Sequence, residues 1–313
     1  MTEFTHTPVL LQEAVAALNV QEEGVYVDGT FGRGGHSRAI LEALGEKGHL
    51  LVIDKDPEAI RIARDTLPFR GDHRVSVFHG SFTQIPSAIV AANIAAPVRG
   101  ILLDLGVSSP QLEDASRGFS FRAAGPLDMR MDITRGQTAA MWINAAAEAD
   151  IADVLWTYGE ERFARRIARA IVGARAEMPF ETTTQLAEVI SKAHPQWPKG
   201  IHPATQSFQA IRLWVNQELE DLIDGLYAAE SVLAPGGRLA IISFHSLEDR
   251  LVKRFFRGDA LHPVQHGGET ERHTTLKGLK GAAGVVVPSE EEIRKNPRAR
   301  SARLRIAENR LQH

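Results

Sequence analysis

The chain has 313 residues, 43% of them hydrophobic and 24% charged, with a formal net charge of −3 at pH 7. This is typical of a globular protein with one large core or two modest ones, and it argues against indiscriminate binding of nucleic acid over the whole surface. There is no cysteine, which excludes disulfides, thiolate metal sites and cysteine nucleophiles. No apolar run reaches membrane-spanning length, and residues 1–6 lack a signal-peptide core, so we expect a cytoplasmic protein with no membrane partner.

The N-terminal third predicts alternating helices and strands. The apolar run at 100–105 is typical of a strand covered on both faces. We therefore expect a parallel, doubly wound α/β sheet. Strands are predicted at 25–27, 49–53, 74–79 and 100–105, and helices at 8–18, 37–44, 57–64 and 84–92.

The alternation stops after residue 110. Residues 111–138 predict an arginine-rich loop, and 139–172 and 184–192 predict helices. We expect residues 1–110 and 204–313 to form a Rossmann-like domain and 111–203 to form an inserted, mainly helical substrate-recognition domain.

The C-terminal part predicts a return to the sheet. A 28-residue amphipathic helix is expected at 206–233 and strands at 238–244 and 302–307. The helix after residue 244 is expected to be capped by Ser246 with Asp249. The glycine-rich residues 259–290 predict a mobile loop with one edge strand.

The loop after the first strand carries the densest functional signal. Residues 29–35 hold four glycines and lead into a helix, so backbone N–H groups can approach a ligand. The spacing is not that of the dinucleotide fingerprint, and Asp28 would repel a pyrophosphate. Asp54, twenty residues beyond Gly34, is placed to hold ribose hydroxyls. S-Adenosylmethionine carries two cationic groups and no phosphate, so we favour it over an ordinary glycine-rich turn.

Four candidate residues follow directly from this topology. In a doubly wound sheet, ligands gather at the carboxyl ends of the strands. Asp28, Asp54, Phe82 and Asp104 all lie at such ends. Their common placement indicates one pocket.

The segment after Asp104 indicates the chemistry. Amino-methylating enzymes place a polar-Pro-Pro-aromatic motif here, whose acceptors localise the lone pair of an exocyclic amine. Ser109 and Pro110 resemble half of that motif, but Gln111 and Leu112 replace the rest. The catalytic candidates are therefore Asp104, Ser109 and Pro110.

A stacking partner for the base has to come from another part of the chain. Core packing is the favoured interpretation for Trp214, and both interpretations stay open for Phe119 and Phe121; Phe244 is a further candidate. The absence of cysteine excludes methylation at pyrimidine C5, which needs a covalent thiolate adduct, and leaves transfer to nitrogen or oxygen.

Long motifs at 28–37, 102–111, 125–132, 208–212, 243–250 and 296–301 closely resemble the bacterial small-subunit rRNA cytosine-N4 methyltransferases, often called RsmH or MraW. The resemblance implies a class I S-adenosylmethionine-dependent methyltransferase sheet with an inserted, mainly helical domain. It further implies N4-methylation of one decoding-region cytidine of 16S rRNA in the assembled small ribosomal subunit. By motif, the cofactor site comprises Gly34, Gly35, His36, Asp54, Phe82, Asp104 and Gln111.

The roles that we expect follow the chemistry of the cofactor. Gly34 and Gly35 contact its methionine portion, Asp54 accepts from both ribose hydroxyls, Phe82 packs on adenine, and Asp104 lies close to the sulfonium. For His36 and His245, a capping or structural role is favoured over proton transfer. No metal constellation is recognised, and a homodimer is left open.

The segment 294–310 has seven basic residues and one acid, Glu308. Together with the arginine-rich loop, it is a candidate for phosphate contacts, although a solvated tail is the alternative. Three rival functions remain: a DNA amino-methyltransferase, a nicotinamide dehydrogenase disfavoured by the glycine spacing, and a non-catalytic assembly factor. Methyl incorporation into purified subunits separates the last from an enzyme.

Overall fold

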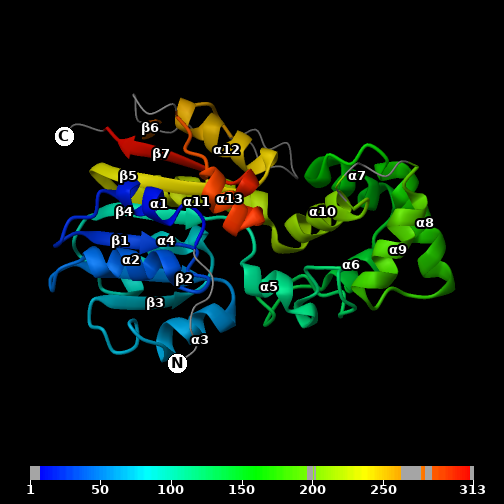
Figure 1. Ribbon diagram of the computed structural model, residues 1–313, viewed down its shortest axis with the longest axis horizontal. Helices are drawn as coiled ribbons and strands as arrows, with labels where there is room; N and C mark the ends of the chain where they lie inside the picture. The colour runs from blue at the N-terminus through cyan, green and yellow to red at the C-terminus, as the bar shows by residue number, and fades with distance from the viewer. Residues whose placement is uncertain (1–7, 196–199, 201, 262–275, 279–283, 311–313) are drawn as a thin grey trace. The chain divides into compact units, whose positions relative to one another are not determined.

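The computed structural model describes residues 8–195, 200, 202–261, 276–278 and 284–310, and the chain forms two compact units (Figure 1). The sheet unit comprises Met1–Gly106 and Leu219–His313, and the helical unit comprises Val107–Glu218. The sequence predicted the second border at residue 204, whereas the helical unit extends to 218 because helix α10 (Thr205–Asn216) packs on helix α7 (Glu148–Gly159). Among the described helices, none is long and apolar enough to cross a membrane.

In the described part of the chain, seven strands form one sheet in the order β3-β2-β1-β4-β5-β7-β6. The first five strands of this order are parallel, and β7 is antiparallel to both of its neighbours. The strands are β1 (Val25–Asp28), β2 (His49–Asp54), β3 (Val75–His79), β4 (Val98–Asp104), β5 (Leu233–Ser243), β6 (Leu276–Gly278) and β7 (Arg303–Asn309).

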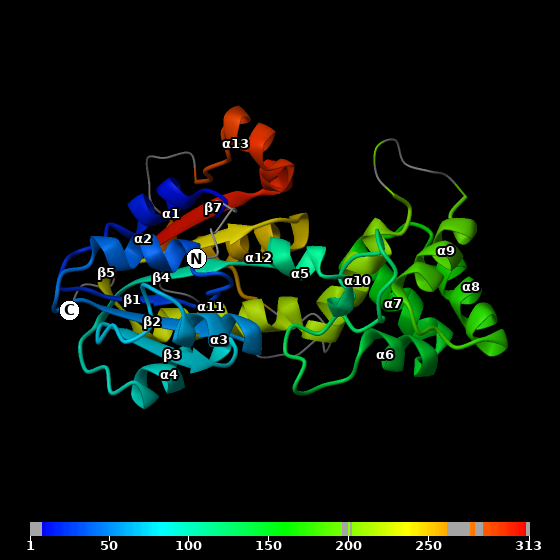
Figure 2. The same cartoon turned by 60° about the horizontal axis from the view of Figure 1, so that its bottom comes forward.

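Helices cover both faces of this sheet (Figure 2). Successive strand residues point to opposite faces, so Leu50 and Val52 join one apolar cluster while Leu51 and Ile53 join the other. The first cluster includes α1 (Leu11–Leu18), α2 (Gly35–Ala43) and α3 (Pro57–Asp65), and the second includes α4 (Ile85–Ala91), α11 (Glu218–Val232) and α12 (Ser246–Arg257). The predicted doubly wound α/β sheet is therefore confirmed.

The helical unit is built from short helices. The predicted helical stretch 139–172 consists of three helices, separated by extended Ala146 and Ala147 and by left-handed Glu160. The predicted loop 111–138 begins with short helical turns. The elements are α5 (Ser109–Glu113), η2 (Ala115–Arg117), α6 (Ala139–Ala145), α7 (Glu148–Gly159), α8 (Ala164–Glu177), α9 (Thr183–Ala193) and α10 (Thr205–Asn216).

The prediction of one helix over 206–233 is wrong, because the helix is broken at Gln217 (φ 53°). The side chain of Asn216 donates to the Met129 carbonyl (2.7 Å) and accepts from the Met131 amide (2.7 Å), which holds the chain where it turns. Arg212 then pairs with Glu218 across the break, at 2.8 and 2.9 Å.

The C-terminal elements differ in detail from the predictions. Strand β5 begins at Leu233, so the Pro-Gly-Gly at 235–237 lies inside the strand, beside an irregularity in its register with β4. Strand β6 pairs only with β7 among the described strands, which confirms the expected edge strand. The expected mobile loop falls mostly on residues 262–275 and 279–283, outside the described residues. The segment 290–301 forms α13 (Glu290–Lys295) and η3 (Pro297–Ser301).

Candidate functional site

The carboxyl ends of β1, β2 and β4 bring three carboxylates together in the sheet unit. Asp28, Asp54 and Asp104 are the last residues of these strands, and β1 lies between the other two. The chain leaves β1 for β2 on one side and reaches β4 on the other, so this is the topological switch point where doubly wound sheets bind ligands.

Asp28 braces the glycine loop. Its side chain is buried, and its carboxylate oxygens accept from the Thr30 amide (3.1 Å) and the Ser37 hydroxyl (2.6 Å). Burial raises the pKa of Asp28 to about 6, and these two hydrogen bonds oppose the rise. Because both oxygens are used within the loop, Asp28 ties β1 to α2 and contributes negative charge at a distance.

Asp54 is oriented by the backbone around it. One oxygen accepts from the Gly32 amide (2.7 Å) and the other from the Asp56 amide (2.8 Å). Burial raises the pKa of this carboxyl to about 6 despite both bonds. Each carboxylate oxygen can accept a further hydrogen bond, so Asp54 can receive a pair of hydroxyls without losing its support.

Asp104 is the one of the three carboxylates with an unmet bonding need. Its backbone amide donates to the Thr30 hydroxyl (2.6 Å), which fixes the end of β4 against the loop. The side chain is 26% exposed, but its Oδ1 atom is buried and has no hydrogen-bond partner among the described residues. Burial, followed by the nearby charges of Asp28 and Glu248, raises its pKa well above the usual range. An ammonium group would donate the missing hydrogen bond, and a nearby sulfonium would favour the ionised carboxylate through its charge.

His36 is a buried, neutral side chain. Its Nε2 lies 3.2 Å from the Val9 carbonyl, which only accepts, so we assign the proton to Nε2. Burial lowers the pKa of the imidazole to about 4. The ring therefore ties α2 to the segment before α1 and turns Nδ1 toward Asp104, which supports the structural interpretation of this histidine.

The glycines permit close packing within the loop. Gly34 (φ 76°) caps α2, and a Cβ there would come within 2.6 Å of the Phe31 ring and 2.7 Å of the Phe69 ring. A Cβ on Gly35 would overlap Pro8. A Cβ on Gly32 (φ 54°) would only touch the Thr30 carbonyl, at 4.0 Å, and the Gly32 amide donates to Asp54; this glycine was not among the candidates expected from the sequence.

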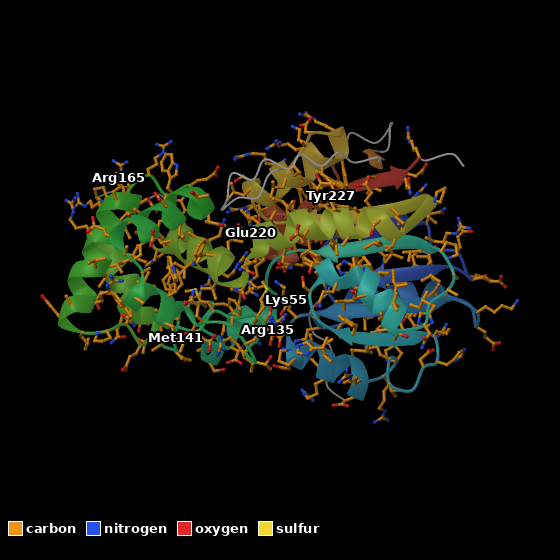
Figure 3. All side chains as sticks on the ribbon, turned by 180° about the vertical axis from the view of Figure 1, so that it is seen from behind. Lys55, Arg135, Met141, Arg165, Glu220 and Tyr227 are labelled. Carbon is orange, nitrogen blue, oxygen red and sulfur yellow. The ribbon has the colours of Figure 1, made fainter. Side chains whose placement is uncertain are left out.

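Phe82 begins η1 (Phe82–Gln84) after β3, and part of its ring is covered by a helix. A Cβ on Gly225 of α11 would overlap the ring, so one surface of Phe82 lies directly on that helix. Asp221, one turn earlier in α11, pairs with Lys55 and accepts from the Ser81 hydroxyl (2.8 Å). Figure 3 labels Lys55. These α11 residues were not among the candidates expected from the sequence, although Gly225, a glycine inside an amphipathic helix, is a signal of close packing.

His245 caps α12, which confirms the capping role favoured for this histidine, whereas the predicted cap of Ser246 with Asp249 is wrong. Its ring accepts from the Glu248 amide (3.4 Å), while the Glu248 carboxylate accepts from the Phe244 (2.8 Å) and His245 (3.3 Å) amides. Glu248 Oε1 also lies 3.1 Å from His245 Nε2 but at an angle unsuited to a hydrogen bond. Asp249 holds Arg305 of β7 instead, at 2.7 and 3.1 Å.

The Ser-Pro turn belongs to the helical unit. Ser108 caps α5, and the Gln111 side chain accepts from the Ser108 amide (2.8 Å) and hydroxyl (3.1 Å). Gln111 is therefore a brace of the turn that presents Ser109 and Pro110. Its expected contact with a cofactor stays a prediction.

The aromatic candidates for base stacking are all packed. Trp214 is half-buried and contacts Trp142 and Tyr158, with ring centroids 5.9 and 5.8 Å apart, which supports the packing role favoured for it. Phe121 packs on Phe208 (4.7 Å). Phe119 is buried, with Arg117 above its ring, and Phe244 packs against the sheet cluster. Among the described residues, no group of three or more histidines and acids could hold a metal.

Comparison with known proteins identifies one family. A family model described as the MraW methylase family matches residues 3–310. Solved structures with a similar fold include a Clostridium thermocellum protein provisionally described as an rRNA methylase (TM-score 0.44, 13% identity, 97% of this chain and 99% of that one). An rRNA methylase from Streptococcus thermophilus matches with a TM-score of 0.41 and 11% identity, over 96% of this chain and 93% of that one. A third structure, solved with S-adenosylhomocysteine, is a Streptococcus mutans protein provisionally described as a methyltransferase. Its TM-score is 0.39 and its identity 12%, over 97% of this chain and 99% of that one. At these scores the structures carry no functional assignment.

Proposed function

Because the chain belongs to the MraW methylase family, we propose that it methylates N4 of one cytidine in the decoding region of 16S rRNA. The acceptor is the assembled small ribosomal subunit. The family match and the sheet order together establish the class I methyltransferase fold with S-adenosylmethionine as cofactor.

The observation that carries the proposal is the uncompensated Asp104 carboxylate, five residues before Ser109 in the chain. A buried carboxylate oxygen without a partner is costly unless a bound cation completes it. S-Adenosylmethionine supplies an electrophilic methyl group on a positively charged sulfur. The residues that would hold it are Asp104 and Asp54, with Gly34, Gly35, His36, Phe82 and Gln111 as the further cofactor residues expected by motif.

The proposed transfer needs orientation more than strong base catalysis. The N4 lone pair of cytosine is delocalised into the ring, and acceptors for the two N4 protons localise it. We assign that task to Asp104, the Ser109 hydroxyl and the Pro110 carbonyl. The methyl group moves from sulfur to N4, the electron pair of the broken bond stays on sulfur, and the extra proton on N4 leaves to solvent. Ser109 and Pro110 are held in a defined turn by Gln111.

RNA contact is proposed for the segment 294–310. Its anchor is buried Ala299, which joins the apolar cluster on one face of the sheet, while Arg294, Arg298 and Arg300 are exposed around it. Asn296 caps η3 by accepting from the Arg298 amide (3.2 Å). The arginines are therefore carried by an ordered turn, which supports a phosphate-binding role over a solvated tail.

Methyl incorporation tests the proposal. The wild-type protein is incubated with isotopically labelled S-adenosylmethionine in three separate reactions. Each reaction contains one acceptor: unmethylated small subunits, protein-free 16S rRNA or duplex DNA. By mass spectrometry, a complete digest to nucleosides then identifies the methylated base, and a partial digest to oligonucleotides locates it in the RNA. We expect N4-methylcytidine at one position, formed on the subunits. Label on duplex DNA, on another nucleoside, or on none of the acceptors would contradict the proposal.

A further inference from the structure

Helix α8 and the turn before it carry a second basic surface. Residues 162–175 include five arginines and no acid. Arg162, Arg165, Arg166 and Arg169 are spaced so that they share one side of the helix, and all four are exposed. The opposite side of α8 is apolar and buried. We call these four residues the α8 arginine face; seven residues of helical rise make it about 10 Å long.

These guanidinium groups are not used to hold the fold. Within the described part of the chain, the side chains of Arg162, Arg165 and Arg166 make no hydrogen bond or ion pair, and that of Arg169 only approaches Glu148 at 3.7 Å. Arg130, elsewhere in the same unit, shows what a structural arginine does: it grips Asp128 through two nitrogens at 2.8 Å. The α8 arginine face thus leaves its donors available to a ligand.

Helix stability does not explain the placement either. Arg165 and Arg166 lie in the first turn of α8, which has no acid and no side-chain cap. The N-terminal end of a helix is its positive pole, so cations there are unfavourable. An anion bound at this face would offset the charge of the arginines and would itself interact favourably with the positive end of the helix.

The charge is local. The helical unit contains 12 lysines and arginines and 13 acids, so it is close to neutral as a whole. The neighbouring helix α7 carries Glu148, Asp150 and Asp153, and Glu160 follows it. Of these four acids, Glu148 is the one for which the described residues show an approach to the arginines. Figure 3 shows Arg165 at the outer surface of this unit.

We propose that the α8 arginine face binds phosphates of the RNA backbone in the substrate. This inference rests on the proposed rRNA substrate and adds a contact beyond the segment 294–310. Guanidinium groups match phosphate oxygens through paired donors. Helix α7, which packs on α8, exposes Trp156 (62%), an aromatic ring of the kind that stacks on unpaired bases. That combination favours RNA over an acidic protein surface.

The test removes three charges together. In one variant, Arg162, Arg165 and Arg166 are replaced by Gln. In the control variant, the exposed Arg61, Arg64 and Arg70 of the sheet unit are replaced by Gln, for the same change in net charge. Binding to purified small subunits and to protein-free 16S rRNA is measured over a series of KCl concentrations, together with kcat, KM and the affinity for S-adenosylmethionine.

We expect the α8 variant to bind subunits at least tenfold more weakly at moderate salt. The slope of log affinity against log salt should fall by roughly two, since each phosphate contact contributes about 0.7–0.9. Its thermal stability should equal or slightly exceed that of the wild type, because two cations leave the positive end of the helix. Its kcat and cofactor affinity should match the wild type, and the control variant should match in kcat, cofactor affinity and subunit binding.

Three results would overturn the inference. Wild-type subunit affinity and salt slope in the α8 variant would remove this face from the footprint, while methylation by the wild type would leave the proposed function standing. Weaker subunit binding with an unchanged salt slope and unchanged binding to protein-free 16S rRNA would assign the face to a ribosomal protein. Equal losses in both variants would reduce the effect to net charge. If the wild type methylates no subunit, the function fails, but selective salt-dependent loss of 16S rRNA binding in the α8 variant would still support the contact.

Discussion

The Nδ1 atom of His36 lies 3.7 Å from Oδ2 of Asp104, and the two groups have pKa values shifted in opposite directions. Burial holds the imidazole neutral, with a pKa of about 4, while burial and two neighbouring carboxylates raise the pKa of Asp104. The pair is therefore not an ion pair. A carboxyl group that is easily protonated, Asp104, therefore lies beside a buried imidazole that stays neutral, His36. The two groups lie at the end of β4, where we expect the cation of the cofactor.

Cofactor binding should release a proton from Asp104. A bound cation favours the carboxylate, so affinity for S-adenosylmethionine should rise with pH until the free protein is already ionised. Asp104→Asn should weaken binding by at least tenfold and flatten this pH dependence, measured by calorimetry in buffers of different ionisation enthalpy. The exposed Asp65→Asn is the matched control. A flat pH profile in the wild type would contradict the assignment.

His36 should make stability depend on pH in a definite window. Its pKa is about 4 when folded and 6.5 when unfolded, so the unfolded chain binds the proton more tightly. The stabilisation is complete above about pH 6.5 and is lost as the pH falls toward 4, by up to about 3 kcal/mol. Denaturant titrations of wild type and His36→Asn should differ in slope against pH across this window. Parallel curves would show that the ring charges freely in the folded state.

Asp54 should matter more for the cofactor than for the fold. Asp54→Ala removes the proposed acceptor for ribose hydroxyls and should weaken S-adenosylmethionine binding by about 1–3 kcal/mol. Asp54→Asn keeps one oxygen acceptor and should fall between Ala and wild type. Because the side chain also holds the Gly32 and Asp56 amides, melting curves accompany the calorimetry. Native cofactor affinity in the Ala variant would refute the role.

The sheet could be predicted because its signals are local and redundant. Runs such as Leu50–Ile53 alternate between the two apolar clusters, and acids at 28, 54 and 104 mark strand ends whatever the exact register. The break at Gln217 could not be predicted from the sequence. It depends on Asn216 bonding to Met129 and Met131, more than 80 residues away, and no periodicity carries that information.

The candidate site likewise has features that could be predicted from the sequence and features that could not. The strand-end positions followed from topology, but the use of each side chain did not. Asp28 and Gln111 use their acceptors within their own turns, and the pattern placed the cap of α12 at Ser246, one residue after the observed cap His245. These outcomes depend on ångström-scale placement, to which residue type and spacing are insensitive.

The two arginines of η3 should contribute to RNA binding through charge alone. Replacing Arg298 and Arg300 by Ala should weaken subunit binding and lower its salt slope by roughly one to two, with kcat retained. Lys47→Ala and Arg64→Ala, combined at exposed positions of the sheet unit, give the charge-matched control. Unchanged affinity at every salt concentration would remove this turn from the footprint.

We expect the fold to require glycine at position 225, because the Phe82 ring lies where a side chain there would be. Glycine inside a helix normally costs about 0.5–1 kcal/mol relative to alanine, so Gly→Ala is stabilising where space allows. At Gly173 of α8 a Cβ would meet nothing within 4 Å, so Gly173→Ala should raise the melting temperature.

At Gly225 the added Cβ overlaps the Phe82 ring, so Gly225→Ala should cost about 1–3 kcal/mol and displace the ring. Weaker cofactor binding should accompany the loss, since Phe82 is the proposed adenine contact. Combining Gly225→Ala with Phe82→Leu should recover stability but not cofactor affinity. If the double variant regains both, Phe82 only fills space against α11; if Gly225→Ala behaves like Gly173→Ala, the close contact itself is wrong.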